Sequence, residues 1–194
     1  MIEIKHISKN YSDKKVINKL SYTLNNEIYL LYGKNGVGKT TLMNLITGIE
    51  SVDSGEIINT LNGPKLYLDA VGIGMTEMSI RDNIKLLFWL HGLRYTDKEI
   101  NSLAAKLYSE DQLDTDYSAA SLGMKLKVGL SLLYSSKNWS LIVLDETLSG
   151  LDRQSKEDVL KQAKLKKCPV VIISHNFDKL DSLKKIKLTN EGIG

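Results

Sequence analysis

The sequence predicts an α/β fold built on a parallel β-sheet. Three short apolar runs, residues 28–32, 141–144 and 170–173, have the length and composition of strands that are buried on both faces of a sheet. Polar residues or glycine follow each run, and residues 39–47, after the first run, have helical spacing. Because open parallel sheets bind ligands at the carboxyl ends of their strands, we expect the chemistry of this chain there.

Two other regions have different patterns. Apolar and polar side chains alternate in parts of residues 2–24, which predicts strands of a small antiparallel sheet. Residues 80–134 have apolar side chains at helical spacing and no strand pattern, which predicts a helical insertion. We therefore expect a single domain over residues 1–194. Its expected parts are a core of about 1–69 and 137–194 and a helical subdomain of about 70–136.

The composition excludes several classes of protein. The chain is 42% hydrophobic and 25% charged, and its apolar runs are far shorter than the roughly 18 residues of a membrane-spanning helix. The single cysteine, Cys168, and the charged N-terminal segment predict a cytoplasmic protein rather than a secreted one. The 26 basic and 23 acidic side chains are too evenly balanced to indicate nucleic-acid binding. Lysine-rich residues 161–167 and 184–187 are interpreted as solvated helix faces.

Residues 33–40 match the phosphate-binding pattern G-x-x-x-x-G-K-[ST] in full, between a predicted strand and a predicted helix. In this arrangement the N–H groups of the loop and the positive end of the helix dipole face the phosphates. We expect Lys39 to reach the β- and γ-phosphates, Thr40 to bind Mg²⁺ and Thr41 to bond near the α-phosphate. The other expected contacts come from the loop itself: Gly33, Lys34, Asn35, Gly36, Val37 and Gly38. A glycine turn that binds nothing is the disfavoured alternative.

Two carboxylates, Asp145 and Glu146, end the second predicted strand. Asp145 is placed to hold Mg²⁺ through water, and Glu146 to polarise a water molecule for attack on the γ-phosphorus. The alternative is that both acids cap a helix that starts near Asp152, which is less favoured beside a phosphate loop.

The motifs and their order along the chain resemble those of the ATP-binding cassette (ABC) ATPases, the nucleotide-binding subunits of ABC transporters. The resemblance covers almost the whole chain. Residues 149–152, ending in Asp152, are similar to the family's D-loop, and His175 is similar to its switch histidine. Residues 7–11 resemble the stretch whose aromatic residue, here Tyr11, stacks on adenine. The resemblance implies a P-loop NTPase fold with a RecA-like parallel sheet, with Glu146 and His175 as catalytic residues.

Residues 120–124, A-S-L-G-M, resemble the family's signature loop, which usually reads close to L-S-G-G-Q. Ser121 and Gly123 are kept, and the variant is similar to that of bacterial peptide and antibiotic export cassettes. The resemblance implies that this loop binds the γ-phosphate held by a second cassette, so that ATP joins two cassettes and hydrolysis separates them.

One position departs from the family pattern. Aligning residues 78–83 with the usual L-T-V-x-E-N places Ala70 where the family has a glutamine that contacts Mg²⁺. A methyl group cannot be a ligand, so we expect a slow ATPase unless Asp69 or a water replaces the glutamine. Residues 86–90 lie where the family receives a short helix of the transmembrane subunit. Most of them are expected in the core, and exposure of Trp89 would favour docking.

The sequence therefore predicts an ATPase that uses ATP and Mg²⁺ and pairs with a second cassette and a separate transmembrane permease subunit. The permease would hold it at the inner face of the cell membrane, and the signature variant suggests peptide or antibiotic export. One alternative is a regulatory ATP-binding module whose hydrolysis is vestigial, because Ala70 and Met124 depart from the family pattern. Another is a relative that acts on nucleic acid or the ribosome, for which this chain is too short.

Overall fold

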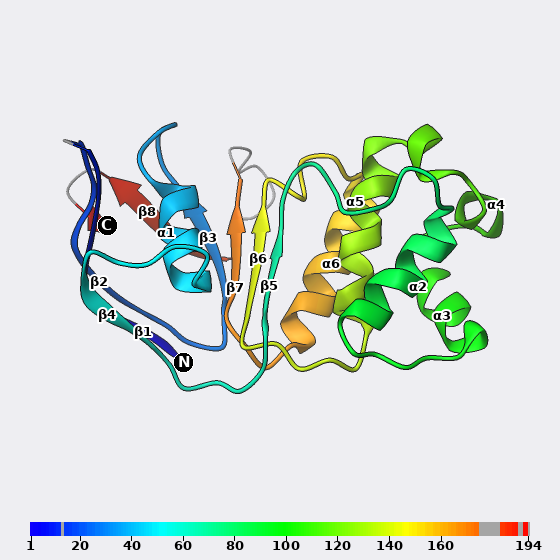
Figure 1. Ribbon diagram of the computed structural model, residues 1–194, viewed down its shortest axis with the longest axis horizontal. Helices are drawn as coiled ribbons and strands as arrows, with labels where there is room; N and C mark the ends of the chain where they lie inside the picture. The colour runs from blue at the N-terminus through cyan, green and yellow to red at the C-terminus, as the bar shows by residue number, and fades with distance from the viewer. Residues whose placement is uncertain (13, 175–182, 190–191, 194) are drawn as a thin grey trace. The chain divides into compact units, whose positions relative to one another are not determined.

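The fold is described from a computed structural model. The structure describes residues 1–12, 14–174, 183–189 and 192–193 (Figure 1). The chain forms two compact units. The first unit comprises residues 1–67, 138–146 and 166–194, and the second comprises residues 68–137 and 147–165.

A β-sheet in the order β5-β6-β7-β3-β8-β9 forms the centre of the first unit (Figure 1). Strands β6 and β3 each run parallel to β7, and β3 also runs parallel to β8. The prediction that the three apolar runs are buried parallel strands is therefore confirmed. The strands of this sheet are β3 (Ile28–Tyr32), β5 (Lys65–Leu68), β6 (Leu141–Asp145), β7 (Val170–Ile173), β8 (Lys184–Thr189) and β9 (Gly192–Ile193).

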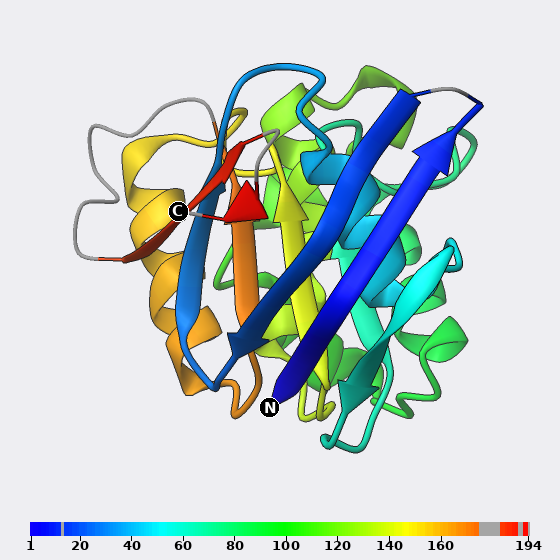
Figure 2. The same ribbon diagram turned by 90° about the vertical axis from the view of Figure 1, so that its left-hand side faces the viewer.

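The first unit also contains a smaller antiparallel sheet in the order β2-β1-β4 (Figure 2). Its strands are β1 (Ile2–Tyr11), β2 (Lys14–Leu24) and β4 (Ser54–Asn59). The predicted antiparallel region at the N-terminus is thus confirmed, and β4 adds a strand from beyond the phosphate loop.

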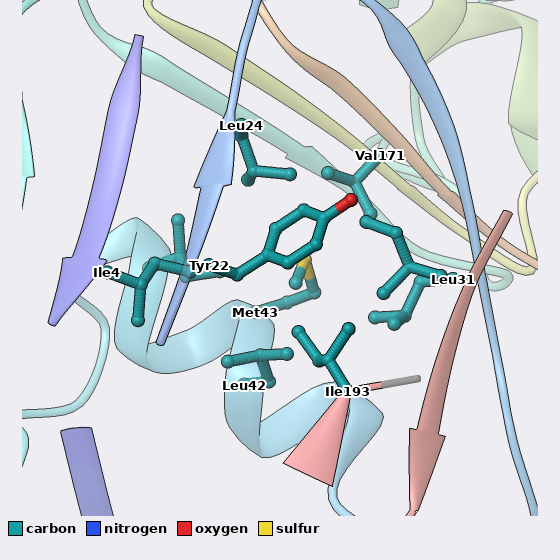
Figure 3. A pocket seen from close by; sticks show the side chains of 10 residues that line it. Ile4, Tyr22, Leu24, Leu31, Leu42, Met43, Val171 and Ile193 are labelled. Carbon is teal, nitrogen blue, oxygen red and sulfur yellow. The ribbon is translucent and has the colours of Figure 1, made fainter. Parts of the chain in front are cut away.

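Helix α1 (Lys39–Thr47) packs between the two sheets of the first unit. Figure 3 shows that Leu42 and Met43 of α1 line the same small pocket as Tyr22 of β2 and Leu31 of β3. These side chains belong to the buried core or pack against it. Because α1 is held from both sides, its N-terminus has a fixed place beside the end of β3.

The second unit is largely helical. Residues 80–134 form helices without a strand, as the spacing of their apolar residues predicts. Residues 147–165 group with this unit, although the sequence analysis placed them in the core, because α6 packs against η2. The helices are α2 (Ile80–Leu90), α3 (Asp97–Ala104), α4 (Glu110–Leu113), η1 (Tyr117–Ala119), α5 (Leu122–Leu130), η2 (Ser131–Tyr134) and α6 (Arg153–Leu165).

One expected helix face is a strand instead. Lys184, Lys185 and Lys187 lie on β8 and are exposed, whereas Ile186 and Leu188 between and after them are buried. The prediction of a helix at residues 184–187 is therefore wrong, because the apolar residues alternate with the period of a strand. Across the described part of the chain, no helix is long and apolar enough to cross a membrane.

A buried asparagine holds the loop that leads into α2. Asn83 is 2% exposed, and its Nδ2 atom donates to the carbonyl oxygens of Met75 and Ser79, at 3.0 Å each. Its Oδ1 atom accepts from the N–H of Met75 at 2.6 Å. The side chain of Asn83 therefore holds a segment that has no regular secondary structure of its own through several hydrogen bonds.

We expect the Asn83→Leu substitution to lower the free energy of unfolding by about 2–4 kcal/mol, because it leaves buried backbone groups without partners at nearly constant volume. Chemical denaturation monitored by circular dichroism measures the change. Asn62→Leu, the same substitution at an exposed position, should change the stability by less than about 0.5 kcal/mol. Equal stabilities of the two variants would contradict this role of Asn83.

Candidate nucleotide-binding site

The loop between β3 and α1 contains the complete phosphate-binding pattern. Gly38 is the N-cap of α1, in a left-handed conformation with φ of 105°, and no side chain caps this helix end within the described residues. The first N–H groups of a helix have no acceptor inside the helix. The positive end of α1 therefore faces the loop that the sequence predicted as a phosphate site.

Lys39, in the first turn of α1, is 8% exposed. Its Nζ atom donates to the carbonyl oxygens of Gly33 at 2.9 Å and Lys34 at 3.2 Å. Among the described residues no carboxylate forms an ion pair with it. A buried ammonium group is costly without an anionic partner, so this position fits a phosphate group.

The backbone of β8 comes so close to position 33 that only a glycine fits there. A Cβ atom on Gly33 would lie 2.4 Å from the carbonyl oxygen of Leu188 on β8, which is closer than real Cβ atoms come. At Gly36 a Cβ atom would meet nothing within 4 Å, although φ is +74°. The start of the loop is thus packed against the sheet, while its middle is open.

The carboxylate of Asp145 lies at the end of β6, beside the phosphate loop. Its Oδ2 atom is 3.5 Å from the Oγ1 atom of Thr40, which is 105 residues away in the sequence. The same Oδ2 atom accepts a hydrogen bond from the Tyr67 hydroxyl at 2.6 Å. A hydroxyl and a carboxylate at this separation are a suitable donor set for Mg²⁺. Sequence reasoning did not single out Tyr67 as a neighbour of Asp145.

Glu146 follows Asp145 in an uncommon backbone conformation. Its φ is 52°, in the left-handed region, which costs of order 1–3 kcal/mol for a residue other than glycine. Its N–H group donates to the carbonyl oxygen of Ile173 at 2.9 Å, so the end of β7 holds this turn. The predicted catalytic partner, His175, lies outside the described residues.

Tyr11 is the last residue of β1, and its side chain remains accessible. It is 43% exposed, and the Nζ atom of Lys9 lies 5.5 Å from the centre of its ring. Its hydroxyl donates to the Oε2 atom of Glu50, and this hydrogen bond raises the pKa of the hydroxyl above its usual value. The exposed ring is suited to stacking on a base.

The signature and D-loop residues lie close together in the second unit. The Ser121 Oγ atom caps α5 by accepting from the N–H of Met124 at 3.3 Å. A Cβ atom on Gly123 would lie 3.0 Å from the carbonyl oxygen of Gly150, so the two loops are in close contact. Asp152 accepts from the N–H of Ser155 at 2.8 Å, so Asp152 caps α6.

Residues 69–72, which include the position that the sequence analysis aligned with the family's glutamine, form a largely exposed turn. The Oδ1 atom of Asp69 accepts from the N–H groups of Val71 at 2.9 Å and Gly72 at 3.3 Å. Ala70, between Asp69 and Val71, is exposed. One oxygen of the Asp69 carboxylate is therefore already used within its own turn.

Known proteins with similar sequences point to the same family as the motifs. Residues 17–149, more than half of the chain, match the family model described as ABC transporter. The zinc import ATP-binding protein ZnuC of Rickettsia conorii is 34% identical, over 91% of this chain and 77% of its own length. The lantibiotic transport ATP-binding protein SrtF of Streptococcus pyogenes is 27% identical, over 94% of this chain and 83% of its own.

A solved structure has the same fold. An ATP-binding cassette in a dimeric post-hydrolysis state, bound to ADP and Pi, matches 100% of this chain and 96% of its own with a TM-score of 0.80. Its sequence identity is 17%, so this likeness concerns the fold alone. The family match shows that the chain belongs to the ABC transporter family. It is the ATP-binding subunit of a transporter, an ATPase whose cofactors are ATP and Mg²⁺.

We expect Gly33→Ala to destabilise the chain more than Gly36→Ala does. Both substitutions force a side chain into a disfavoured backbone conformation, which costs about 1–2 kcal/mol. At Gly33 the clash with Leu188 adds about 1–3 kcal/mol. Thermal unfolding of the two variants measures the difference. Equal melting temperatures would show that the start of the loop is not packed against β8 as described.

Proposed function

We propose that this chain hydrolyses ATP between two cassettes and so drives transport through a separate membrane subunit. The observation that carries the proposal is the environment of Lys39. This buried ammonium has hydrogen bonds to neutral carbonyl groups, and it lies at the positive end of α1. The ammonium group of Lys39 and the positive end of the α1 dipole thus both lie near the Thr40 and Asp145 pair. Binding of a metal-bound triphosphate requires such positive charge.

The binding roles follow from the positions of these residues. The N–H groups of residues 33–38 and the Nζ atom of Lys39 bind the β- and γ-phosphates, and Thr41 bonds near the α-phosphate. Thr40 and Asp145 hold Mg²⁺, and Tyr11 stacks on the adenine base. All of these residues belong to the first unit.

The hydrolytic roles fall to two other residues. Bound ATP supplies the γ-phosphoryl group that is transferred to water. Glu146 orients that water molecule and takes up its proton as the new bond to phosphorus forms. His175 is proposed to orient Glu146 and the water.

A second cassette would complete the site. Ser121 and the N–H group of Gly123, at the positive end of α5, would bind the γ-phosphate held by the partner, and Asp152 would contribute through the D-loop. The dimeric cassette that shares this fold supports the arrangement, since it was solved with hydrolysis products bound. Contacts to the γ-phosphate hold two cassettes together only while ATP is intact.

The membrane subunit is proposed to dock at the end of α2. Trp89 is 58% exposed and Leu90 is 63% exposed, whereas Leu87 and Phe88 beside them are buried. Two adjacent large apolar side chains in water suggest a contact surface. Docking there would hold the chain at the cytoplasmic face of the membrane.

For the cargo we propose a peptide or an antibiotic that is exported. The signature variant and the similarity to a lantibiotic transport protein support this, whereas the similarity to a zinc import protein argues for another cargo. A regulatory ATP-binding module is the alternative that Ala70 favours. The ATPase rate with and without a candidate membrane subunit separates the two, because stimulation is expected only for a transport motor.

We expect the Glu146→Gln variant to form a stable dimer when MgATP is added, because it keeps all the binding groups and loses the base. Light scattering coupled to gel filtration measures the mass. Adding Lys39→Ala to the same variant should restore the monomer, since nucleotide binding is lost. A Glu146→Gln protein that stays monomeric at high concentration in saturating MgATP would contradict the dimer mechanism.

We also expect Ala70→Gln to raise the turnover number several-fold, because it restores the polar group with which the family contacts Mg²⁺. The matched control is Ala70→Leu, which adds similar volume without polar atoms and should leave turnover low. Steady-state phosphate release at saturating MgATP gives both values. An unchanged or lower rate in Ala70→Gln would show that this position does not correspond to the family's glutamine.

A further inference from the structure

We propose that Glu50 is a positioning residue that fixes the ring of Tyr11 relative to the phosphate-binding helix α1. The proposal rests on the proposed stacking of Tyr11 on the base of the nucleotide. Glu50 lies in the segment between α1 and β4, outside every motif that the sequence analysis identified.

The two carboxylate oxygens of Glu50 bind two different elements. Its Oε2 atom accepts from the hydroxyl of Tyr11 at the end of β1. Its Oε1 atom accepts from the Nδ2 atom of Asn44 on α1 at 2.8 Å. Both hydrogen bonds also lower the pKa of Glu50, the Tyr11 bond more than the Asn44 bond, so the carboxylate is kept ionised. The carboxylate of Glu50 thus joins the side chain of Tyr11 at the end of β1 to that of Asn44 on α1.

The backbone around Glu50 is fixed as well. The N–H group of Glu50 donates to the carbonyl oxygen of Asn44 at 3.2 Å. Further along the segment, the N–H group of Asp53 donates to the carbonyl oxygen of Ser8 at 2.9 Å, and Asp53 Oδ2 accepts from the N–H of Asn10 at 2.7 Å. These bonds set the course of the backbone near Tyr11. The direction of the Tyr11 ring depends on its own side-chain contacts.

An aromatic ring that is 43% exposed at the end of a strand has rotational freedom to lose on binding. A charge-assisted hydrogen bond to its hydroxyl selects one orientation before the nucleotide arrives, and such preorganisation lowers the cost of binding. Because Asn44 lies on the helix whose N-terminus faces the phosphates, the same bonds set the separation between the base site and the phosphate site. The contribution of Glu50 should therefore appear only for ligands that carry a base.

The experiment compares two ligands that share the phosphate chemistry. Isothermal titration calorimetry of the full chain with ADP and with inorganic tripolyphosphate, both with Mg²⁺, measures the two affinities. We expect Glu50→Ala and Tyr11→Phe each to weaken ADP binding about three- to tenfold and to leave tripolyphosphate binding unchanged. The loss in the double variant should be smaller than the sum of the two single losses, because both substitutions remove the hydrogen bond between Tyr11 and Glu50.

Two controls limit the interpretation. Glu56→Ala removes an exposed carboxylate on β4 that pairs with Lys5, and it should leave both affinities unchanged. Glu50→Gln keeps an acceptor for the Tyr11 hydroxyl and should recover part of the ADP affinity. Melting temperatures of all variants establish that each is folded.

The outcomes separate this proposal from the one on which it rests. If Tyr11→Ala leaves ADP affinity unchanged, the ring does not stack on the base, and the proposed role of Tyr11 is wrong. If Tyr11→Ala weakens ADP binding while Glu50→Ala and Tyr11→Phe do not, the stacking role stands and the positioning role of Glu50 is overturned. Equal losses for ADP and tripolyphosphate in Glu50→Ala also overturn it, since Glu50 would then support the fold in general.

Discussion

The packing of α1 between the two sheets is the constraint on which the rest of the first unit depends. Its buried residues Leu42, Met43, Leu45 and Ile46 each contribute about 1.5–3 kcal/mol through removal of apolar surface from water. A helix held in this way cannot shift along its axis without opening the core. Its N-terminus therefore stays at the phosphate loop, and its C-terminal half stays at the segment that holds Glu50. One apolar interface thus fixes the places of two polar sites.

The parallel sheet brings together side chains that are distant in the sequence. Strands β3 and β6 both run parallel to β7, so the residues that follow them lie at the same edge of the sheet. Thr40 and Asp145 meet there across 105 residues. Tyr67 reaches the same carboxylate from β5, next to β6 in the sheet. The strained backbone of Glu146 occurs directly after this edge, as is usual for functional positions.

The sequence predicted the parts of this arrangement that repeat a local pattern. The helix at residues 39–47 has the predicted bounds, since the phosphate loop marks its start and Gly48 its end. Single polar contacts between distant segments have no period and no motif, so Tyr67 and Glu50 could not be found as partners of Asp145 and Tyr11. The lysines of β8 are a different case, because charge alone does not distinguish a helix from a strand, whereas the alternation of buried Ile186 and Leu188 with exposed lysines is that of a strand.

The residues proposed to bind the chain's own nucleotide and those proposed to act on the partner's nucleotide lie in different units. The residues proposed to hold the nucleotide, Lys39 and Tyr11 among them, belong to the first unit, whereas Ser121 and Ala70 belong to the second. The positive environment of Lys39 does not depend on position 70, because the phosphate loop and α1 make it. Under the role proposed for position 70, the chain would keep its affinity for ATP and only its hydrolysis rate would fall.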